Sequence, residues 1–312
     1  MAGGISVSAY QMKTPVLLII FNRPDSTRKV FAAIRQARPP KLFVSADGPR
    51  PGNKADLENC RAARAIINQV DWDCELYTNL REENFGCMRG PCSAITWFFD
   101  QVEEGIIFED DCLPHPTFFR FCEELLARYR DDERVMTISG DNFLFGRKEI
   151  PYSYYFSRYP HIWGWATWRR AWQHFDATLS LWPTIKKENR LIDLFEDKNL
   201  LKTFTRLFDK VYEGEIVTVW DYQWTFTSLM QNGLTILPKV NLVSNIGFLP
   251  AGTHTQKENV LANLPSEPMV FHLSHPPFVL RDSLADQITQ SYCFNLKWFP
   301  LRALSKIKRI IT

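Results

Sequence analysis

The sequence predicts an α/β protein whose centre is a mostly parallel, doubly wound β-sheet with helices on both faces. Over about the first 140 residues, short apolar runs typical of strands alternate with amphipathic segments typical of helices. Runs that are apolar throughout are expected where helices cover both faces of a strand. Polar turns follow several of these runs. In such sheets ligands bind at the carboxyl ends of the strands, so these turns are where we expect function.

The predicted elements follow one another in a regular order. Residues 15–24 (PVLLIIFNRP) hold the first strand and its polar turn, and residues 25–37 form a helix with Val30, Phe31 and Ile34 on one face. Further strands are predicted within residues 41–52, 74–79, 105–111 and 134–140, and further helices at residues 55–70, 92–102 and 116–132. This alternation predicts parallel strands joined by crossover helices.

The second half of the chain has another character. Residues 160–175 (PHIWGWATWRRAWQHF) and 217–233 (VTVWDYQWTFTSLMQNG) are rich in tryptophan. Residues 234–245 are again strand-like, whereas residues 247–268 form a long polar stretch without periodicity, which is typical of a lid or a disordered loop. The C-terminal residues 296–312 are amphipathic and basic, which predicts a surface helix.

The composition narrows the class of protein. The chain has 312 residues, 45% hydrophobic and 23% charged, which is ordinary for a globular protein with a large core. A net charge of +2 provides no global field that would attract nucleic acid. The 7 cysteines form no CxxC pair, so we expect reduced thiols in a cytoplasmic protein. We expect no signal peptide and no membrane-spanning segment, because no apolar run reaches about 18 residues.

Three consecutive carboxylates, Glu109, Asp110 and Asp111, directly follow the apolar residues 106–108. Charge is costly inside a covered strand, so the carboxylates should lie at its carboxyl end, where they repel one another. A hard cation such as Mn²⁺ or Mg²⁺ resolves such repulsion and takes oxygen ligands from carboxylates and substrate phosphates. The triplet therefore predicts a diphosphate anchor, or alternatively a solvated acidic turn before the helix near Pro116.

Other strand ends carry polar residues with two interpretations each. Arg23 follows the first strand, where it could bind a phosphate or a base, or be an exposed turn charge. Asp47 follows the second strand, where it could accept a hydrogen bond from a nucleobase, or be an ordinary turn aspartate before Gly48. Arg89 is a further candidate phosphate contact, or a surface arginine at a helix start.

The tryptophan-rich segments contain two further candidates. Gly164 directly precedes Trp165, which indicates either a close approach to the backbone or plain core packing. Asp221 stands between Trp220 and Trp224. A carboxylate beside indole rings has its pKa raised by desolvation, which suits a general base. The alternative for Asp221 is an N-cap of the helix that follows, and the two roles are compatible.

Taken in order, these motifs resemble the nucleotide-sugar-dependent glycosyltransferases of GT-A fold, most specifically N-acetylglucosaminyltransferase I and its bacterial relatives. The matching segments are VLLIIFNRPDS, VSADGP, GIIFEDDCLPHPTFFRFCEELL, DDERVMTISGDN, IWGWATWRRAW, VWDYQW and SNIGF. The resemblance extends over residues 13–255. It implies one GT-A domain with a nucleotide-sugar-binding half at residues 13–150 and an acceptor-binding, catalytic half at residues 151–265. A C-terminal helical extension would follow at residues 266–312.

The resemblance also implies roles for single residues. Asp111 looks like the ligand of Mn²⁺ (or Mg²⁺), Asp47 like the contact to uracil, and Asp221 like the catalytic base. Further contacts to the nucleotide sugar are expected from Arg23, Arg89, Glu109, Asp110 and Trp165. Lid or diphosphate contacts are expected from Thr253, His254 and His275, although His275 could equally pack beneath the last helix.

The implied activity is transfer of a sugar, GlcNAc or a related hexose, from a UDP-linked donor to a saccharide hydroxyl, with inversion at the anomeric carbon. The enzyme would serve polysaccharide biosynthesis in a bacterial cytoplasm. The basic C-terminal helix could meet a membrane that carries a lipid-linked glycan acceptor, or could form a solvated face or an oligomer contact. The basic residues concerned are Arg302, Lys306, Lys308 and Arg309.

Two other functions fit parts of the pattern. A metal-dependent sugar nucleotidyltransferase would use a similar sheet and acidic turn, but it normally needs a Gly-rich, Lys-containing phosphate loop, which FNRPDSTRK is not. A non-catalytic carbohydrate-binding protein would explain the tryptophans but not the carboxylates. It would bind sugars independently of metal and nucleotide.

Overall fold

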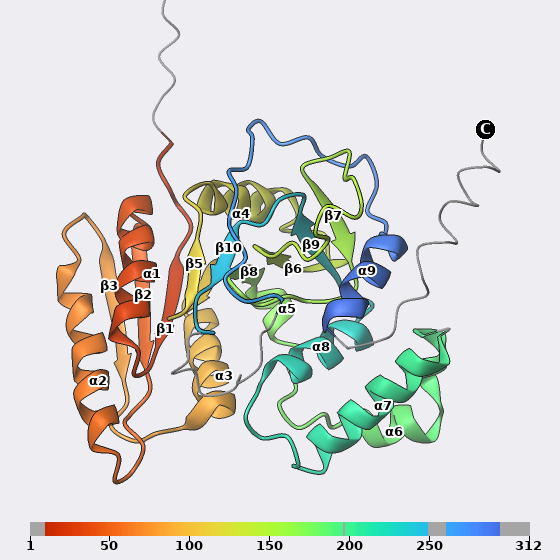
Figure 1. The fold of residues 1–312 in the computed structure, drawn as a ribbon, viewed down its shortest axis with the longest axis horizontal. Helices are drawn as coiled ribbons and strands as arrows, with labels where there is room; N and C mark the ends of the chain where they lie inside the picture. Colours follow the sequence, from red (N-terminus) through yellow and green to blue (C-terminus); the bar gives the residue numbers. More distant parts are fainter. Residues whose placement is uncertain (1–9, 196, 249–259, 294–312) are drawn as a thin grey trace, which may run out of the picture.

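The computed structural model describes residues 10–195, 197–248 and 260–293, and its centre is an eight-stranded sheet (Figure 1). The strands of the first half are β1 (Val16–Ile20), β2 (Lys41–Ala46), β3 (Glu75–Leu80), β4 (Glu104–Glu109) and β6 (Val135–Ser139). Those of the second half are β7 (Tyr154–Ser157), β8 (Trp165–Trp168) and β9 (Leu234–Pro238). Their order across the sheet is β3-β2-β1-β4-β8-β6-β9-β7.

The sheet is mostly parallel, as the sequence predicts. β1, β2, β3 and β4 pair in parallel, and β6 pairs in parallel with β9. Only β8 and β7 run against the others: β8 lies antiparallel between β4 and β6, and β7 lies antiparallel beside β9 at the edge. Because β8 comes from the second half of the chain, the two predicted halves share one sheet.

Helices lie on both faces of this sheet. The longer ones are α1 (Pro24–Ala37), α2 (Lys54–Ala65), α3 (Gly86–Phe99), α4 (Thr117–Arg128), α7 (Lys198–Tyr212), α8 (Asp221–Met230) and α9 (Ser283–Cys293). Short ones are η1 (Ile66–Gln69), α5 (Arg169–Trp172), α6 (Trp182–Lys187) and η2 (Arg190–Asp193). None of the helices in the described part of the chain is long and apolar enough to cross a membrane.

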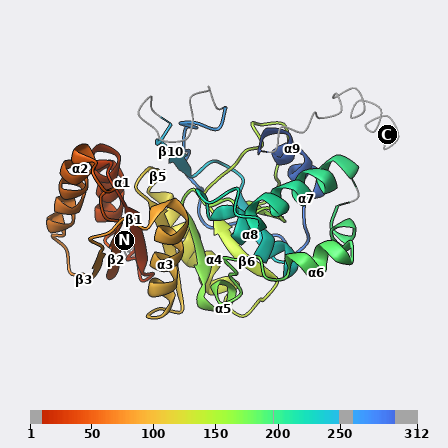
Figure 2. The same cartoon turned by 90° about the horizontal axis from the view of Figure 1, so that it is seen from below.

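Burial explains the two layers of helices. β1 is buried along its whole length: Val16, Leu18 and Ile20 face the core formed with α1 and α4, while Leu17 and Ile19 face the core formed with α3, α5 and α8. Such a strand reads as a continuous apolar run, which is why the sequence reveals it clearly. α6, η2, α7 and α8 build a separate aromatic core, and in both ribbon views α6 and α7 lie at the opposite end of the molecule from α2 (Figures 1 and 2).

The sheet topology creates one distinctive edge. From the central strand β1 the chain moves outward through β2 and β3, then returns to pair β4 with the other side of β1. The order of strands therefore changes between β1 and β4, where a crevice forms at the carboxyl ends. The short strands β5 (Cys112–Pro114) and β10 (Val243–Asn245) pair directly beyond the end of β4 (Figure 2). We call this side of the sheet the carboxyl edge.

Two elements differ from the sequence prediction. α3 starts at Gly86 instead of residue 92, because the N–H groups of Phe85 and Gly86 donate to the distant Asp47 carboxylate, which fixes the start of the helix. Pro91 consequently lies inside the helix. The Trp-rich residues 165–168 form the inserted strand β8.

Candidate active site

Four segments that are far apart in the sequence meet at the carboxyl edge. The N–H of Phe21, directly after β1, donates to Asp110 Oδ2 at 3.0 Å. The indole Nε1 of Trp220 donates to Glu109 Oε1 at 3.2 Å. The N–H of Ile246, directly after β10, donates to the carbonyl oxygen of Asp111 at 2.8 Å. The sequence motifs around residues 23, 110, 221 and 247 thus belong to one site.

Arg23 supplies the positive charge that the three carboxylates require. Its Nη1 lies 2.5 Å from Asp111 Oδ2 and 3.8 Å from Asp110 Oδ1. The backbone places Arg23 near these carboxylates. Only three residues separate the end of β1 from Pro24, the first residue of α1, and the Arg23 carbonyl accepts the N–H of Thr27. Proline at the first helical position is preorganised for this turn.

The carboxylates still repel one another despite Arg23. Burial, followed by the charge of Asp111, raises the pKa of Glu109 and of Asp110 above the usual carboxyl range. Burial opposes the charged form of Arg23, yet the Asp110 and Asp111 carboxylates keep its pKa above the usual value. Arg23 therefore does not fully offset the cost of keeping these buried carboxyl groups charged.

Gly247 leaves the space that the Arg23–Asp111 ion pair occupies. A Cβ at this position would lie 2.1 Å from Asp111 Oδ2 and 3.0 Å from Arg23 Nη1. The N–H of Gly247 donates to the Asn245 side chain at 2.9 Å, which fixes the backbone beside the pair. The segment SNIGF is identified only by its family resemblance, because no local sequence pattern shows that its glycine must face a carboxylate.

Asp221 is the first residue of α8, and its carboxyl group is only partly satisfied. Its Oδ1 is buried and has no hydrogen-bond partner among the described residues. Burial raises the pKa of Asp221 to about 6. Trp220 is the N-cap residue and its side chain makes no capping hydrogen bond, so Asp221 lies one position beyond the N-cap that the alternative assigned to it. The charge of Asp221 also contributes to raising the pKa of Glu109, so the two carboxyl groups belong to one electrostatic cluster.

The tryptophans around Asp221 form core, not a surface. Trp165 is 1% exposed and packs with Trp172, Trp220 and Trp224 at ring distances of 5.8 to 6.3 Å. Its side chain therefore presents no face to a ligand in this structure, and the core-packing alternative describes it. Trp220 joins this cluster to the site through its bond to Glu109. The sequence does not reveal this hydrogen bond, because 111 residues separate Trp220 from Glu109.

Gly164 is explained by internal packing. Its φ is +65°, and a Cβ would lie 2.7 Å from Val243 Cγ2 and 3.2 Å from the Phe108 ring. The close approach that the sequence indicated is therefore made by β10 and β4.

Asp47 lies at the carboxyl end of β2, as predicted, where it holds the start of α3. Its oxygens accept the N–H groups of Phe85 and Gly86, each at 2.9 Å, and the Asn84 side-chain amide at 3.1 Å. Nη1 of Arg81 also lies 4.0 Å from Asp47 Oδ1, so groups of the protein surround this carboxylate. Arg89 is exposed, and its guanidinium lies 5.0 Å from the centroid of the Phe85 ring.

The predicted lid residues are outside this cluster or outside the described residues. Thr253 and His254 fall within residues 249–259, which the structure does not describe. His275 contacts the hydroxyl of Tyr154 at 3.0 Å through Nδ1 and the carboxylate of Glu124 at 3.3 Å through Nε2. These partners lie on β7 and α4, so the described polar contacts of His275 tie its segment to the sheet and to α4, away from the carboxylate cluster.

A second network that the sequence did not reveal joins the turns after β1 and β2. Asp56 is buried in α2 and accepts the Asn22 side-chain amide at 2.6 Å and Nη2 of Arg50 at 2.8 Å. These bonds hold the two polar turns together at the carboxyl edge. A lone aspartate in the first turn of a helix gives no sequence signal for this, because acidic residues are common there.

The oxygen atoms of the site suit a divalent ion that takes most of its ligands from the bound substrate and from water. Among the described residues no group of three or more His, Cys, Asp or Glu side chains is arranged to hold a metal ion. Asp111 nevertheless offers a carboxylate beside further carboxyl oxygens, and oxygen donors are the ligands that Mn²⁺ and Mg²⁺ prefer. These residues fit an ion held by one protein carboxylate and completed by substrate oxygens and water.

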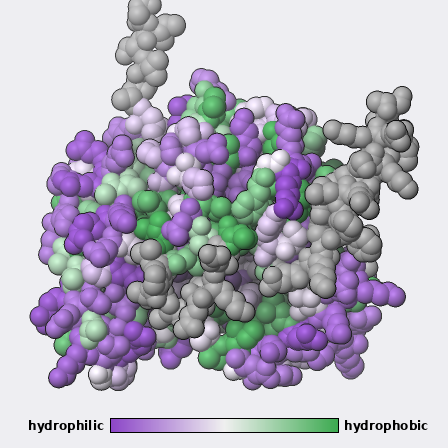
Figure 3. All heavy atoms as spheres, viewed as in Figure 1, coloured by the Kyte–Doolittle hydropathy of each residue, from purple (hydrophilic) through white to green (hydrophobic). Residues whose placement is uncertain are grey.

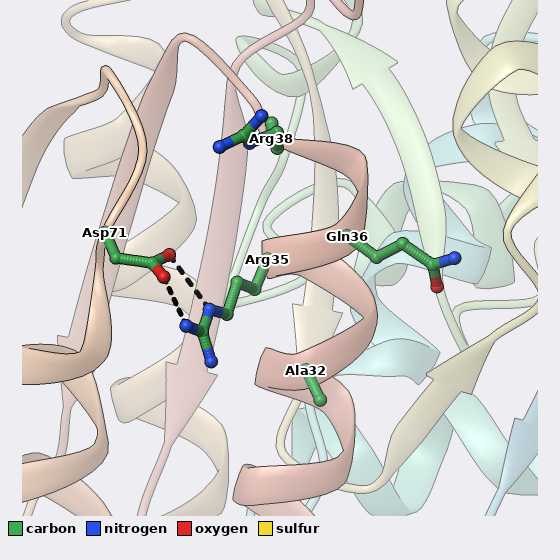
Figure 4. Close-up of a pocket in the computed structure, with 5 residues that line it drawn as sticks. All are labelled: Ala32, Arg35, Gln36, Arg38 and Asp71. Atoms are coloured by element: carbon green, nitrogen blue, oxygen red, sulfur yellow. Dashed lines mark hydrogen bonds and ion pairs between the residues drawn. The ribbon is translucent and has the colours of Figure 1, made fainter.

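The surface depression at the other end of α1 is a different kind of site. It is lined by Ala32, Arg35, Gln36, Arg38 and Asp71, and an ion pair between Arg35 and Asp71 crosses it (Figure 4). No carboxylate cluster faces it among these lining residues. The space-filling view likewise shows a largely hydrophilic face with only scattered apolar patches (Figure 3).

Comparison with known proteins gives only partial overlaps. No protein-family model and no curated protein matches the chain. HddC from Yersinia pseudotuberculosis overlaps 50% of this chain and 77% of its own, at 9% identity and a TM-score of 0.30. Mouse xyloside xylosyltransferase 1 in its apo form overlaps 68% of this chain and 80% of its own, at 12% identity and a TM-score of 0.33. A UDP-glucose pyrophosphorylase complexed with UDP-glucose overlaps 48% and 59%, at 13% identity and a TM-score of 0.24. Overlaps at these TM-scores assign neither a family nor an activity to this chain.

Proposed function

We propose that this protein is a metal-dependent glycosyltransferase that moves a sugar from a nucleotide-diphosphate donor to a hydroxyl of a saccharide acceptor, with inversion. The observation that carries the proposal is the meeting of Glu109–Asp111 with Asp221, whose Oδ1 is buried without a partner. Glycosyl transfer needs a group that anchors the metal and diphosphate and a base that accepts the proton of the acceptor hydroxyl. The acidic cluster suits the first function, and a carboxyl group of raised pKa suits the second. UDP as the nucleotide and GlcNAc as the sugar are the expectations that come from the family resemblance.

The donor would bind at the carboxyl ends of β1 and β4. Asp111 would hold the divalent ion, and Arg23, at the first turn of α1, would contact the diphosphate together with the positive end of the helix. A bound divalent ion supplies charge neutralisation for the departing nucleoside diphosphate. Asp47 would contact the base while it continues to hold the start of α3.

Asp221 would be the general base of the reaction. Its Oδ1 would accept the proton of the acceptor hydroxyl while the hydroxyl oxygen bonds to the anomeric carbon. The bond from that carbon to the diphosphate oxygen breaks, and its electron pair leaves with the nucleotide. A pKa of about 6 suits this role, because the carboxylate is ionised at neutral pH and is a stronger base than an ordinary aspartate. One displacement of this kind inverts the anomeric carbon.

The structure favours this function over the two alternatives. The turn between β1 and α1 consists of Phe21, Asn22 and Arg23, so it contains no glycine-rich loop of the kind that a nucleotidyltransferase would need. A carbohydrate-binding protein would present its tryptophans to sugar faces. Four of the ten tryptophans, Trp165, Trp168, Trp182 and Trp224, are instead among the largest fully buried side chains. The basic C-terminal helix lies outside the described residues, so its membrane contact stays a prediction.

The proposed function is tested by a binding screen followed by a matched variant. Thermal shift and calorimetry would compare UDP, GDP, CDP and their sugars with and without Mn²⁺. We expect one nucleotide to bind in a metal-dependent manner, and we expect Asp111→Asn to weaken that binding about 100-fold, since a charge-assisted contact is lost. Asp71→Asn, which removes the same charge from the surface pair, is the control. Metal-independent sugar binding, or release of pyrophosphate from an NTP and a sugar phosphate, would overturn the proposal.

A further inference from the structure

Arg23 pairs with the carboxylate that the proposed function assigns to the metal ion. Its Nη1 lies 2.5 Å from Asp111 Oδ2, and its side chain is 32% exposed against 14% for Asp111. Gly247 closes another side of the same carboxylate oxygen, since even a Cβ there would come within 2.1 Å of it. A cation that approaches Asp111 Oδ2 therefore meets a guanidinium that already holds this oxygen.

We propose that Arg23 is a positioning residue that keeps Asp111 from holding a divalent ion until a nucleoside diphosphate enters the site. The inference rests on the proposed function, because it requires a metal-dependent nucleotide site at the carboxyl edge. It goes beyond that function by assigning to one ion pair the control over when the metal binds. Metal and nucleotide would then bind as one cooperative unit.

The energetic reason is an exchange of partners. A divalent ion entering alone must separate Arg23 from Asp111, which leaves a partly buried guanidinium beside a doubly charged cation. A diphosphate that enters with the ion gives Arg23 a new anionic partner, with which arginine forms bidentate, charge-assisted bonds. Asp111 is then released to the ion, and the close ion pair that Arg23 made with Asp111 is replaced by one with the diphosphate. The same two side chains thus oppose metal binding without diphosphate and favour it with diphosphate.

The backbone allows this exchange with little rearrangement. The carbonyl of Arg23 accepts the N–H of Thr27 at 3.0 Å and its hydroxyl at 2.7 Å, so the main chain is fixed by α1 while the long side chain can change partners. Arg23 also lies directly before the N-terminus of the 14-residue helix α1, where the helix dipole favours an anion.

The test is the affinity of the protein for Mn²⁺ alone, measured from the electron paramagnetic resonance signal of unbound Mn²⁺. We expect Arg23→Gln to bind Mn²⁺ about tenfold more tightly than the wild type when no nucleotide is present, within the usual range of coupling between two ligands. Arg23→Lys should behave like the wild type, since it keeps the charge. Arg35→Gln is the matched control: it breaks an exposed arginine–aspartate pair, with Asp71, near the other end of the same helix, and should leave Mn²⁺ affinity unchanged.

Two further measurements assign the effect to Asp111 and to the diphosphate. Adding Asp111→Asn to the Arg23→Gln variant should abolish the gained affinity. Saturating UDP, GDP or CDP, whichever binds, should raise the Mn²⁺ affinity of the wild type about tenfold, and clearly less in Arg23→Gln. The wild-type measurement requires no variant to fold, so it stands even if Arg23→Gln is unstable.

The outcomes separate the two proposals. Equal Mn²⁺ affinity of wild type and a folded Arg23→Gln, with metal-dependent nucleotide binding intact, would overturn the role of Arg23 and leave the proposed function standing. If nucleotide fails to raise the Mn²⁺ affinity of the wild type although both bind, the inference and the metal dependence of the proposed function are both overturned, because the effect of each ligand on the affinity for the other is reciprocal. Absence of metal-dependent binding of any nucleotide would instead overturn the proposed function and the inference with it.

Discussion

The two ends of helix α1 each carry an arginine–aspartate pair, and the comparison shows what makes one of them functional. At the carboxyl edge Arg23 pairs with Asp111, with side chains 32% and 14% exposed. About 20 Å away, at 1.5 Å per residue along the helix, Arg35 pairs with Asp71, with side chains 49% and 53% exposed (Figure 4). The chemistry of the two pairs is the same, and only their surroundings differ.

The surroundings decide what each pair can do. Around Asp111 stand two further carboxylates, the start of a helix, and a glycine that leaves no room for a side chain. Around Asp71 there is solvent, which screens the pair and makes it worth little. Where several carboxyl groups are buried together, a bound cation or anion changes the electrostatic energy of all of them. The predictions below test this difference between the two ends of the helix.

The largest effect is expected at Asp221, the enclosed carboxyl group for which the described residues provide no counter-ion. Asp221→Asn keeps the shape of the side chain but removes the base, so we expect turnover to fall about 10³-fold, within the contribution of a general base. Release of nucleoside diphosphate from the donor measures turnover, with acceptor or with water as the attacking hydroxyl. Binding of the Mn²⁺–nucleotide complex should be unchanged. Turnover at the wild-type level would remove Asp221 from its assigned role.

The pH dependence of turnover should reflect the same enclosure. Because burial raises the pKa of Asp221 to about 6, the base is protonated and inactive below that pH and ionised above it. Turnover should therefore fall about tenfold for each pH unit below 6, as expected for loss of one proton-accepting group. A profile of turnover in the wild type, from about pH 3.5 to pH 8, measures it. A limb near pH 4, the value of an exposed aspartate, would show that the group is not enclosed.

The stability effect of the same carboxyl group has the opposite sign. Its folded-state pKa lies above the ordinary aspartate value of 3.8, so the protonated form favours folding and its contribution is complete below that value. That contribution is lost as the pH rises through about 6. Asp221→Asn should therefore become more stable relative to the wild type between pH 4 and pH 7, which urea unfolding at several pH values would detect. A constant difference would contradict it.

A smaller effect is expected from a substitution at Gly247, which would fill the space beside the Asp111 carboxylate. A Cβ would lie 2.1 Å from Asp111 Oδ2, so Gly247→Ala must displace this carboxylate. We expect metal-dependent nucleotide binding to weaken about tenfold and stability to fall by about 1 kcal/mol, typical of modest overpacking. Gly90→Ala is the control, since its Cβ would meet Asp47 at an ordinary 3.6 Å. Unchanged binding by Gly247→Ala would show that the position of Asp111 is not set by this contact.

The sequence predicts one half of the fold well and the other half poorly, for a physical reason. β1, β2 and β4 are nearly or fully buried and read as continuous apolar runs, so their class and order follow from the sequence alone. β8 has four residues and finds its place only by pairing with β4 on one side and β6 on the other. Pairing across such separations leaves no local pattern, and the helical lobe of α6 and α7 was not predicted at all.

The candidate site divides in the same way. That Asp221 would have a raised pKa was predicted from its tryptophan neighbours, and the direction is confirmed. The bond from Trp220 to Glu109 and the contact of Gly247 with Asp111 could not be predicted, since each depends on the folded arrangement of distant segments. For Trp165 the sequence could not decide between two roles, because a tryptophan beside a glycine has the same sequence pattern whether it faces a ligand or the core.

The smallest effect is expected at the exposed end of the comparison. Arg35→Gln removes the same charged group as Arg23→Gln, and from the same helix, but its partner Asp71 is surrounded by solvent. Exposed pairs contribute little, so we expect the melting temperature, Mn²⁺ affinity and turnover all to stay at wild-type values. A thermal melt and the Mn²⁺ titration used for Arg23→Gln measure this side by side. If Arg35→Gln altered Mn²⁺ affinity as strongly as Arg23→Gln, the effect would come from net charge on α1 and not from the enclosure of Asp111, because only the charge is common to both variants.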